Sequence, residues 1–474
     1  MSQWPSVAAI ADDVRSGRSK AADLVEKSLK TIEDNDDYKA IIALTADRAR
    51  ERAQTIDSKI AAGEQVGRLA GVPFIAKDNF LTFGSETTAA SNILKGFNAP
   101  YQATAINRLE AEGAICVAKA NLDAFAHGSS TENSDYFTTK NPNDKTRVPG
   151  GSSGGSAAAV VLDMVPFALG TDTGGSIRLP ASFCGAVGYK PTYGLVSRSG
   201  VVAMASSTDV IGPLTRTVED TALVLDVMSG KDELDGTTTD KDQTGYEIAD
   251  ADLKGVKIGM IKEYMGEGLD PGVKKQIELA VEKIKKAGAQ IREVSLPSLP
   301  LALGVYYIIC PAEVSSNLSR YDGQRYGYND ADAKDLLESY NKARSTGFNR
   351  ENKRRIMIGT YVLSSGYYDA YYKRAQIVRT KLINEFKTAF DEVDFLIGPT
   401  APSTAFKIGE NVEDPLQMYL TDIMTVAVNL AGVPAISIPA GMSEGLPVGL
   451  QVIAAQRQDK KLLNTANKIE EQLS

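Results

Sequence analysis

Two runs rich in glycine and serine contain the residues best suited to nucleophilic chemistry. Residues 150–156 read Gly-Gly-Ser-Ser-Gly-Gly-Ser, and residues 170–180 include Ser176 directly after two glycines. Ser152 fits the Gly-x-Ser-x-Gly elbow of α/β-hydrolases, but that triad needs a histidine after the serine. The only histidine, His127, precedes both runs. A chymotrypsin-like order would formally allow it, yet a lone histidine is usually an ordinary polar side chain. The sequence therefore disfavours a histidine triad.

A lysine is the best remaining candidate for the base. Burial disfavours the charged form of lysine and lowers its pKa toward neutrality, which is how Ser–Lys hydrolases work. Lys77 ends an apolar run over residues 71–76, which predicts the end of a buried strand. A strand-end lysine that reaches solvent is the alternative. Position alone does not decide between the two, and it does not choose Ser176 over Ser152 as nucleophile.

The second run could also bind a developing negative charge. Successive backbone N–H groups at Gly174, Gly175 and Ser176 could converge on one point and form an oxyanion hole without side chains. Asp172 and Arg178 flank this loop with opposite charges and could fix its geometry. An ordinary tight turn would have a similar composition.

Composition narrows the possible functions further. The 474-residue chain has a net charge of −8, which argues against a surface that coats nucleic acid. Cys116, Cys184 and Cys310 are odd in number and far apart, so we predict neither a disulfide framework nor a metal site. Residues 1–10 lack the pattern of a signal peptide. The longest apolar run, residues 157–170, is interrupted by Asp163 and is too short to span a bilayer. We expect a cytoplasmic protein with no membrane association.

Helical and strand-like segments alternate along the chain. Apolar spacing predicts an N-terminal pair of helices over residues 7–33 and 40–60, within a helical segment 1–60 that packs on the core. Residues 104–112 predict a helix that stops at Gly113, followed by a buried strand over 114–118. The same order recurs with a strand over 256–261, a helix over 274–287 and a strand over 290–294. This alternation predicts an α/β protein.

No sequence feature marks a firm domain boundary. The Gly/Ser-rich region 128–216 contains many apolar residues, which a solvated linker would not need. Residues 231–252 are polar and residues 330–353 are charged, and we predict both to be peripheral excursions from one domain that spans residues 1–474.

Taken together, the motifs resemble the amidase signature family. The matching elements are ordered and specifically spaced: Pro-Phe-Ile-Ala-Lys-Asp ending at residue 78, the run at 150–156, and Asp-Thr-Gly-Gly-Ser-Ile-Arg at 172–178. The match continues through residues 184–194 and 212–216. The resemblance implies one α/β domain with a mixed central sheet that helices cover on both faces.

The resemblance also implies catalytic roles. Ser176 would be the nucleophile, Ser152 a bridging serine on a cis peptide bond, and Lys77 the base. Backbone N–H groups of Thr173, Gly174 and Gly175, continuing to Ser176, would hold the oxyanion.

Within the family, the chain is similar to the A subunits of tRNA-dependent amidotransferases. Motifs at residues 320–323, 354–360, 366–372 and 429–434 carry this likeness. It implies hydrolysis of glutamine to glutamate and ammonia, with Tyr306, Arg355 and Asp422 binding glutamine; the neighbouring Tyr307 is an alternative to Tyr306. Without the resemblance, Arg355 could equally be part of a solvated basic helix end.

The same likeness implies partners. B and C subunits would complete a heterotrimer, the partner would bind ATP, Mg²⁺ and most of the charged tRNA, and this chain would need no cofactor. Ammonia would amidate ATP-activated Glu-tRNA(Gln) or Asp-tRNA(Asn). A stand-alone amidase for small amides and a degenerate scaffold are the alternatives, and the presence of all three catalytic residues disfavours the scaffold.

One segment departs from the pattern of these A subunits. They usually read Asp-Glu-Phe-Ala-Met-Gly where this chain has Asp-Ala-Phe-Ala-His-Gly at residues 123–128. Ala124 thus removes a carboxylate, and His127 replaces an apolar residue, near the expected substrate loop.

Overall fold

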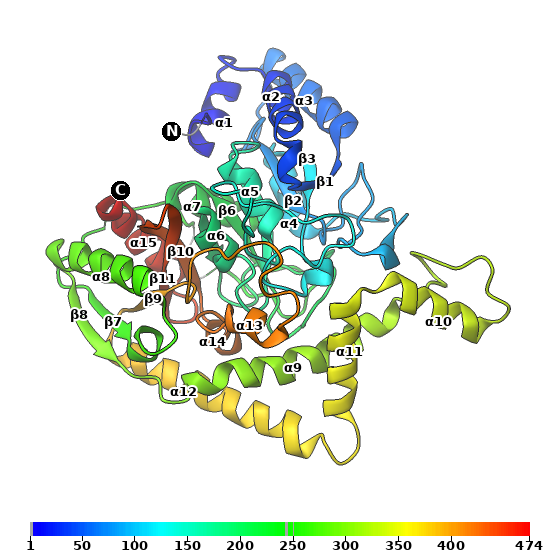
Figure 1. The fold of residues 1–474 in the computed structure, drawn as a ribbon. Coiled ribbons are helices and arrows are strands. Elements are labelled where there is room, and N and C mark those ends of the chain that lie inside the picture. Colours follow the sequence, from blue (N-terminus) through cyan, green and yellow to red (C-terminus); the bar gives the residue numbers. More distant parts are fainter. Residues whose placement is uncertain (1–2, 242–244, 250) are drawn as a thin grey trace.

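The computed structural model describes residues 3–241, 245–249 and 251–474. Within them, eleven strands form one mixed sheet with the order β1-β3-β2-β4-β6-β5-β10-β11-β9-β7-β8 (Figure 1). The strands are β1 Ile41–Leu44, β2 Pro73–Lys77, β3 Ile115–Ala120, β4 Phe167–Asp172, β5 Val187–Lys190, β6 Val210–Thr215, β7 Lys257–Ile261, β8 Gln290–Val294, β9 Phe395–Pro399, β10 Ala435–Ser443 and β11 Leu446–Ala454. Strand β2 lies parallel to both β3 and β4, whereas β4 and β6 are antiparallel. The predicted α/β class with a mixed sheet is confirmed.

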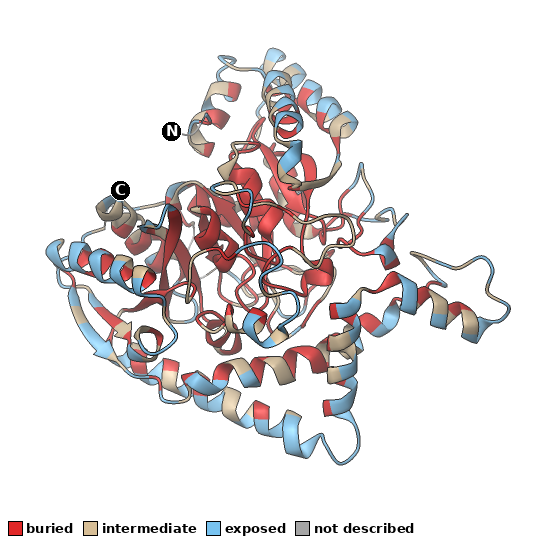
Figure 2. Ribbon diagram, in the orientation of Figure 1, coloured by how far each residue is buried: buried red, intermediate tan, exposed pale blue. Residues whose placement is uncertain are grey.

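Helices pack against both faces of this sheet. They are α1 Val7–Arg15, α2 Ala21–Asp34, α3 Ala46–Ala61, α4 Thr104–Ala111, α5 Gly154–Val161, α6 Arg178–Cys184, α7 Val218–Met228, α8 Pro271–Lys286, α9 Ala302–Asn317, α10 Leu336–Gly347, α11 Arg350–Leu363, α12 Arg374–Glu392, α13 Pro415–Leu420, α14 Val426–Ala431 and α15 Asp459–Leu473. Figure 2 shows buried residues concentrated in the strands and in the helices around them, and exposed residues on the outer faces of the peripheral helices.

Strand β2 shows why the sheet must be covered on both sides. Phe74 and Ala76 belong to a core that includes residues of α4, α7 and α15, whereas Ile75 belongs to a second core with residues of α2, α3 and α5. Side chains alternate between the two faces of a strand, so a continuous apolar run buries both faces. The next position, Lys77, is therefore buried as well.

The N-terminal segment differs from the prediction. Residues 7–33 form two helices, α1 and α2, because the chain turns at Gly17 with φ +73°. Residues 40–60 begin with β1, which pairs antiparallel with β3, before α3 starts. Four residues are too few to display a strand period, so only pairing with β3 could reveal the strand.

The two predicted excursions are only partly peripheral. The described residues of 231–252 contain no helix or strand, but Tyr246 is fully buried and Asp235 pairs with Arg198; residues 242–244 and 250 lie outside the described residues. In 330–353 the helix α10 is only partly exposed, because Ser339, Ala343 and Gly347 are buried, and Asn352 belongs to α11 and is fully buried. The predicted end of this excursion, at residue 353, therefore falls inside α11.

Helices α9, α11 and α12 form the lower edge of the molecule in Figure 1, and α11 packs against α9. Among the described residues, only Leu299–Arg320 around α9 is long and apolar enough to cross a membrane. Half of its most apolar window is buried inside the protein, as in the core helix of a globular fold.

Candidate active site

Lys77 lies at the end of β2, between its neighbours β3 and β4, and is completely buried. Its Nζ atom lies 2.7 Å from Ser152 Oγ, 3.0 Å from Ser153 Oγ and 2.9 Å from Thr171 Oγ1. The alternative of a strand-end lysine that reaches solvent is therefore excluded.

Burial lowers the pKa of Lys77 to about 7, against the raising effects of Asp123, Asp172 and Asp209. The three contacts suit a neutral amine, which has two N–H donors and one lone pair. Ser153 Oγ lies 3.2 Å from the Thr171 carbonyl oxygen, to which it donates, and its lone pairs can accept from Lys77. If Ser153 and Thr171 accept the two N–H bonds, the lone pair faces the Ser152 hydroxyl. Lys77 can then remove a proton from Ser152.

The loop that carries Ser152 depends on close backbone packing. The Gly151–Ser152 peptide bond is cis, as the family resemblance implied. A Cβ atom on Gly151 would lie 2.2 Å from Oδ2 of Asp123, so only glycine fits there. Asp123 is buried and accepts hydrogen bonds from the N–H groups of Thr131 and Asn133. Burial raises the pKa of Asp123 to about 6.

Ser176 occupies the loop between β4 and α6. Its carbonyl oxygen accepts a hydrogen bond of 3.1 Å from the N–H of Ser153, which ties the two serine loops together. Ser176 retains 8% of its surface exposed, whereas Lys77 and Ser152 have none. Of the three residues, Ser176 is thus the one that a substrate can reach.

The buried carboxylate of Asp172 holds the loop that carries Ser176 in place. Its carboxylate accepts from Nε of Arg178 at 3.0 Å and from Nη2 at 2.9 Å, and both side chains are fully buried. It also accepts from Asn429 and from the N–H groups of Gly175 and Ile177. Burial alone would raise the pKa of Asp172, but Arg178 and these donors hold it well below its usual range.

The prediction for the oxyanion donors needs a correction at Gly175. Its N–H donates to Asp172 Oδ1 at 2.9 Å, so it is not free to bind an oxyanion. Gly175 has φ +140°, and a Cβ atom there would lie 2.2 Å from Oγ1 of Thr425. The N–H groups of Thr173, Gly174 and Ser176 make no hydrogen bond within the described part of the chain, and they remain candidates.

The predicted substrate residue Asp422 lies in a second buried cluster. Its Oδ2 atom accepts from the Tyr307 hydroxyl at 3.1 Å and from the Ser129 hydroxyl at 3.2 Å. Burial raises the pKa of Asp422 to about 7, although Arg355 opposes the shift.

Arg355, on α11, is only 3% exposed, which excludes a solvated helix end. Its Nε donates to Glu351 Oε1 at 2.8 Å. Its guanidinium lies 5.3 Å from the ring centroid of Tyr307 and 5.6 Å from that of Tyr419, and these rings stack 3.9 Å apart. The terminal nitrogens of Arg355 have no hydrogen-bond partner among the residues described, so they can bind an anion.

The two neighbouring tyrosines lie differently. Tyr306 packs on the oxyanion loop, since a Cβ atom on Gly174 would lie 2.6 Å from its ring. Tyr307 bonds to Asp422 and faces Arg355. Sequence reasoning missed the contacts of Ser129, Glu351 and Tyr419; only the spacing of Glu351, one helical turn before Arg355, gave a usable signal.

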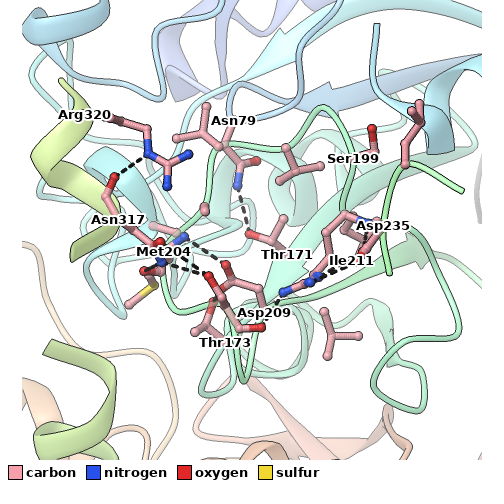
Figure 3. A pocket seen from close by; sticks show the side chains of 18 residues that line it. Asn79, Thr171, Thr173, Ser199, Met204, Asp209, Ile211, Asp235, Asn317 and Arg320 are labelled. Carbon is pink, nitrogen blue, oxygen red and sulfur yellow. Dashed lines mark hydrogen bonds and ion pairs between the residues drawn. The ribbon is translucent and has the colours of Figure 1, made fainter. Parts of the chain in front are cut away.

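Figure 3 looks into a cavity of about 240 Å³ beside these loops. Thr171, a partner of Lys77, lines it together with Thr173, whose hydroxyl donates to Asp209 at 2.8 Å. Beside Thr171, Asn79 donates a hydrogen bond of 3.2 Å to its hydroxyl (Figure 3). The loop that precedes Ser176 therefore forms part of the wall of this cavity, next to Asp209.

Comparisons with known proteins agree on the family. The family model described as Amidase matches residues 23–463. One glutamyl-tRNA(Gln) amidotransferase A subunit, the one numbered 2 in Clostridium acetobutylicum, is 53% identical, over 96% of this chain and 96% of its own length. The corresponding protein of Geobacillus thermodenitrificans is 52% identical, over 95% and 93%.

Solved structures show the same fold. The crystal structure of the glutamyl-tRNA(Gln) amidotransferase A subunit from Thermotoga maritima has a TM-score of 0.78 and 42% identity, covering 94% of this chain and 90% of that one. A bacterial aryl acylamidase of the amidase signature family has a TM-score of 0.87 at 26% identity, covering 99% and 96%.

The Asp172–Arg178 pair gives a testable prediction. In Arg178→Met, Asp172 would be left as a buried and poorly compensated charge, so we expect a loss of roughly 3–5 kcal/mol in the free energy of unfolding, measured by urea denaturation. The matched control Arg50→Met removes an exposed partner of Glu26 and should leave the unfolding midpoint unchanged. A loss below about 1 kcal/mol, the range of a surface pair, would contradict the role given to Arg178.

Proposed function

Because the chain belongs to the amidase signature family, we propose that it hydrolyses the side-chain amide of glutamine as the A-type component of a tRNA-dependent amidotransferase. The observation that carries the proposal is a pair of opposite charges, Arg355 and Asp422, in one buried cluster. A free amino acid presents a carboxylate and an ammonium group on the same carbon. A simple amide has neither, so an enzyme for simple amides would have no need for both charges.

In the proposed reaction, Ser176 attacks the amide carbon of glutamine. Its proton passes to Ser152 as the proton of Ser152 passes to Lys77. The N–H groups of Thr173, Gly174 and Ser176 would stabilise the oxyanion. Collapse of the tetrahedral intermediate breaks the C–N bond, and the proton held by Lys77 passes through Ser152 to the leaving nitrogen, which departs as ammonia and leaves Ser176 in an ester with the γ-glutamyl group. Water then hydrolyses the γ-glutamyl ester by the same relay, which gives glutamate and restores Ser176.

The α-groups of glutamine would bind the second cluster. Arg355 can pair with the α-carboxylate in a two-pronged hydrogen bond, and Asp422 can accept from the α-ammonium. An ammonium beside Asp422 favours its ionised form and would offset the effect of burial on its pKa. Tyr306, which packs on Gly174, would lie between the α-groups and the reacting amide.

The names of the relatives support a complex. Ammonia released here would be used by a partner protein to amidate ATP-activated Glu-tRNA(Gln), or Asp-tRNA(Asn), in the cytoplasm. B and C subunits would complete the assembly, and the partner would hold ATP, Mg²⁺ and most of the tRNA. The net charge of −8 suits a component that leaves most RNA contact to others. The runner-up function, a stand-alone amidase, is favoured only by structural likeness to free amidases.

Co-purification distinguishes these two functions. A tagged chain, recovered from its own host, should elute with its partners, and the assembly should hydrolyse glutamine and amidate Glu-tRNA(Gln) or Asp-tRNA(Asn) in the presence of ATP. Glutaminase activity is measured before and after the partners are separated. A monomer that hydrolyses simple amides and ignores glutamine would overturn the proposal.

The nucleophile can be identified by trapping. A glutamine analogue with an electrophilic diazoketone should modify one residue, and peptide mass spectrometry should locate the added mass on Ser176. We expect Ser176→Ala to lose this modification, while Ser58→Ala, a control on the exposed side of α3, keeps it. Modification that persists on another serine of Ser176→Ala would disprove the assignment.

A further inference from the structure

His127 is the only histidine of the chain, and it lies in the loop between β3 and α5 with no exposed surface. The proposed mechanism gives it no role, yet it is a fully buried polar side chain next to the cluster that contains Arg355.

The contacts of Asn352 fix the form of this imidazole. The Asn352 amide nitrogen donates to the Ala124 carbonyl oxygen at 2.9 Å and lies 2.7 Å from His127 Nδ1. The reversed amide would place two oxygens 2.9 Å apart at Ala124, so the nitrogen must face both partners. Nδ1 therefore accepts, and the network assigns the proton of His127 to Nε2. Burial, and then the charge of Arg355, hold the pKa of His127 well below its ordinary value, which agrees with a neutral ring.

This contact joins the two parts of the proposed amino-acid site. Asn352 precedes Arg355 by one turn on α11. His127 precedes Ser129 by two residues, and the Ser129 hydroxyl donates to Asp422 Oδ2. The distance between Arg355 and Asp422 therefore depends on how α11 is held against the loop. A second bond, from the Asn349 amide to the Asn133 carbonyl at 2.6 Å, fastens the start of α11 to the same loop.

Stability alone does not explain a polar pair in this place. His127 Nε2 and Asn352 Oδ1 are buried and have no hydrogen-bond partner among the described residues. A buried polar group without a hydrogen-bond partner destabilises the folded state. Apolar side chains of similar size would avoid that cost, so the pair serves placement rather than stability.

We propose that His127 and Asn352 are positioning residues that set the spacing between Arg355 and Asp422 and thereby select substrates that carry both an α-carboxylate and an α-ammonium group. The inference rests on the proposed glutamine hydrolysis. It adds a determinant of specificity beyond the two charged residues themselves.

Kinetics of the full assembly test this inference. His127→Leu removes the acceptor, and we expect KM for glutamine to rise roughly tenfold, equivalent to about 1.4 kcal/mol, with kcat changed less than about twofold because Ser176, Ser152 and Lys77 are untouched. His127→Asn keeps an acceptor near the position of Nδ1 and should recover most of the affinity. Thr360→Ala, exposed on the same helix, is the control. For glutaramate, which lacks the α-ammonium group, His127→Leu should change KM less than for glutamine.

The wild-type protein provides a second readout that does not depend on how a variant folds. With ¹⁵N-labelled histidine, one imidazole should appear, and its shifts should show a protonated Nε2 and a bare Nδ1.

Different experimental results would contradict the proposed function and the positioning role. A wild-type assembly without glutaminase activity would contradict the proposed function. An active wild type whose His127→Leu variant keeps its KM for glutamine, or whose imidazole carries its proton on Nδ1, would overturn the positioning role alone.

Discussion

The hydrogen bond between Lys77 and Ser152 depends on a lysine that is kept away from water. A charged ammonium is costly inside a folded core, and no carboxylate among the described residues forms a hydrogen bond with Lys77. Lys119, on the neighbouring strand β3, has different surroundings. That lysine is equally buried but forms an ion pair of 2.9 Å with Asp78, so its charge has a partner. The two lysines lie on neighbouring strands, but Lys119 faces a carboxylate whereas Lys77 faces three hydroxyl groups, which suits Lys77 to act as a base.

The rest of the site maintains this arrangement. Strand β2 is buried on both faces, so its last residue cannot reach solvent. The loop before α5 must come close enough for Ser152 to meet the amine, which requires glycine at position 151 against Asp123. On the other side, the Asp172–Arg178 pair holds the loop of Ser176 through several backbone N–H groups. The two loops that carry Ser152 and Ser176 are therefore held in place by the buried ion pair and by close backbone packing. The second buried cluster, which contains Arg355 and Asp422, is held by α9 and α11.

Much of the fold could be read from local patterns, because β2, α4 and β3 each carry a complete apolar period and clear end signals. Strand β1 could not, since it exists only through its pairing with β3. The site shows the same division. Residue types disfavoured a histidine triad and favoured a lysine base, but the ordered family motifs were needed to choose Lys77 and Ser176. Contacts across distant segments, such as Ser129 with Asp422 or Gly151 with Asp123, leave no trace in spacing.

The central claim is that Lys77 acts as a neutral base, and the pH dependence of serine modification tests it most directly. A small sulfonyl fluoride has no α-groups, so its reaction with Ser176 does not depend on the titration of Asp422. Because only the neutral amine can accept a proton, the second-order rate should rise with pH, reach half its maximum near the pKa of Lys77 at about 7, and then level off. Lys77→Met should lower the plateau by roughly 10²–10⁴-fold. A rate that keeps rising to the range of an ordinary lysine, or that is unchanged in Lys77→Met, would contradict the account.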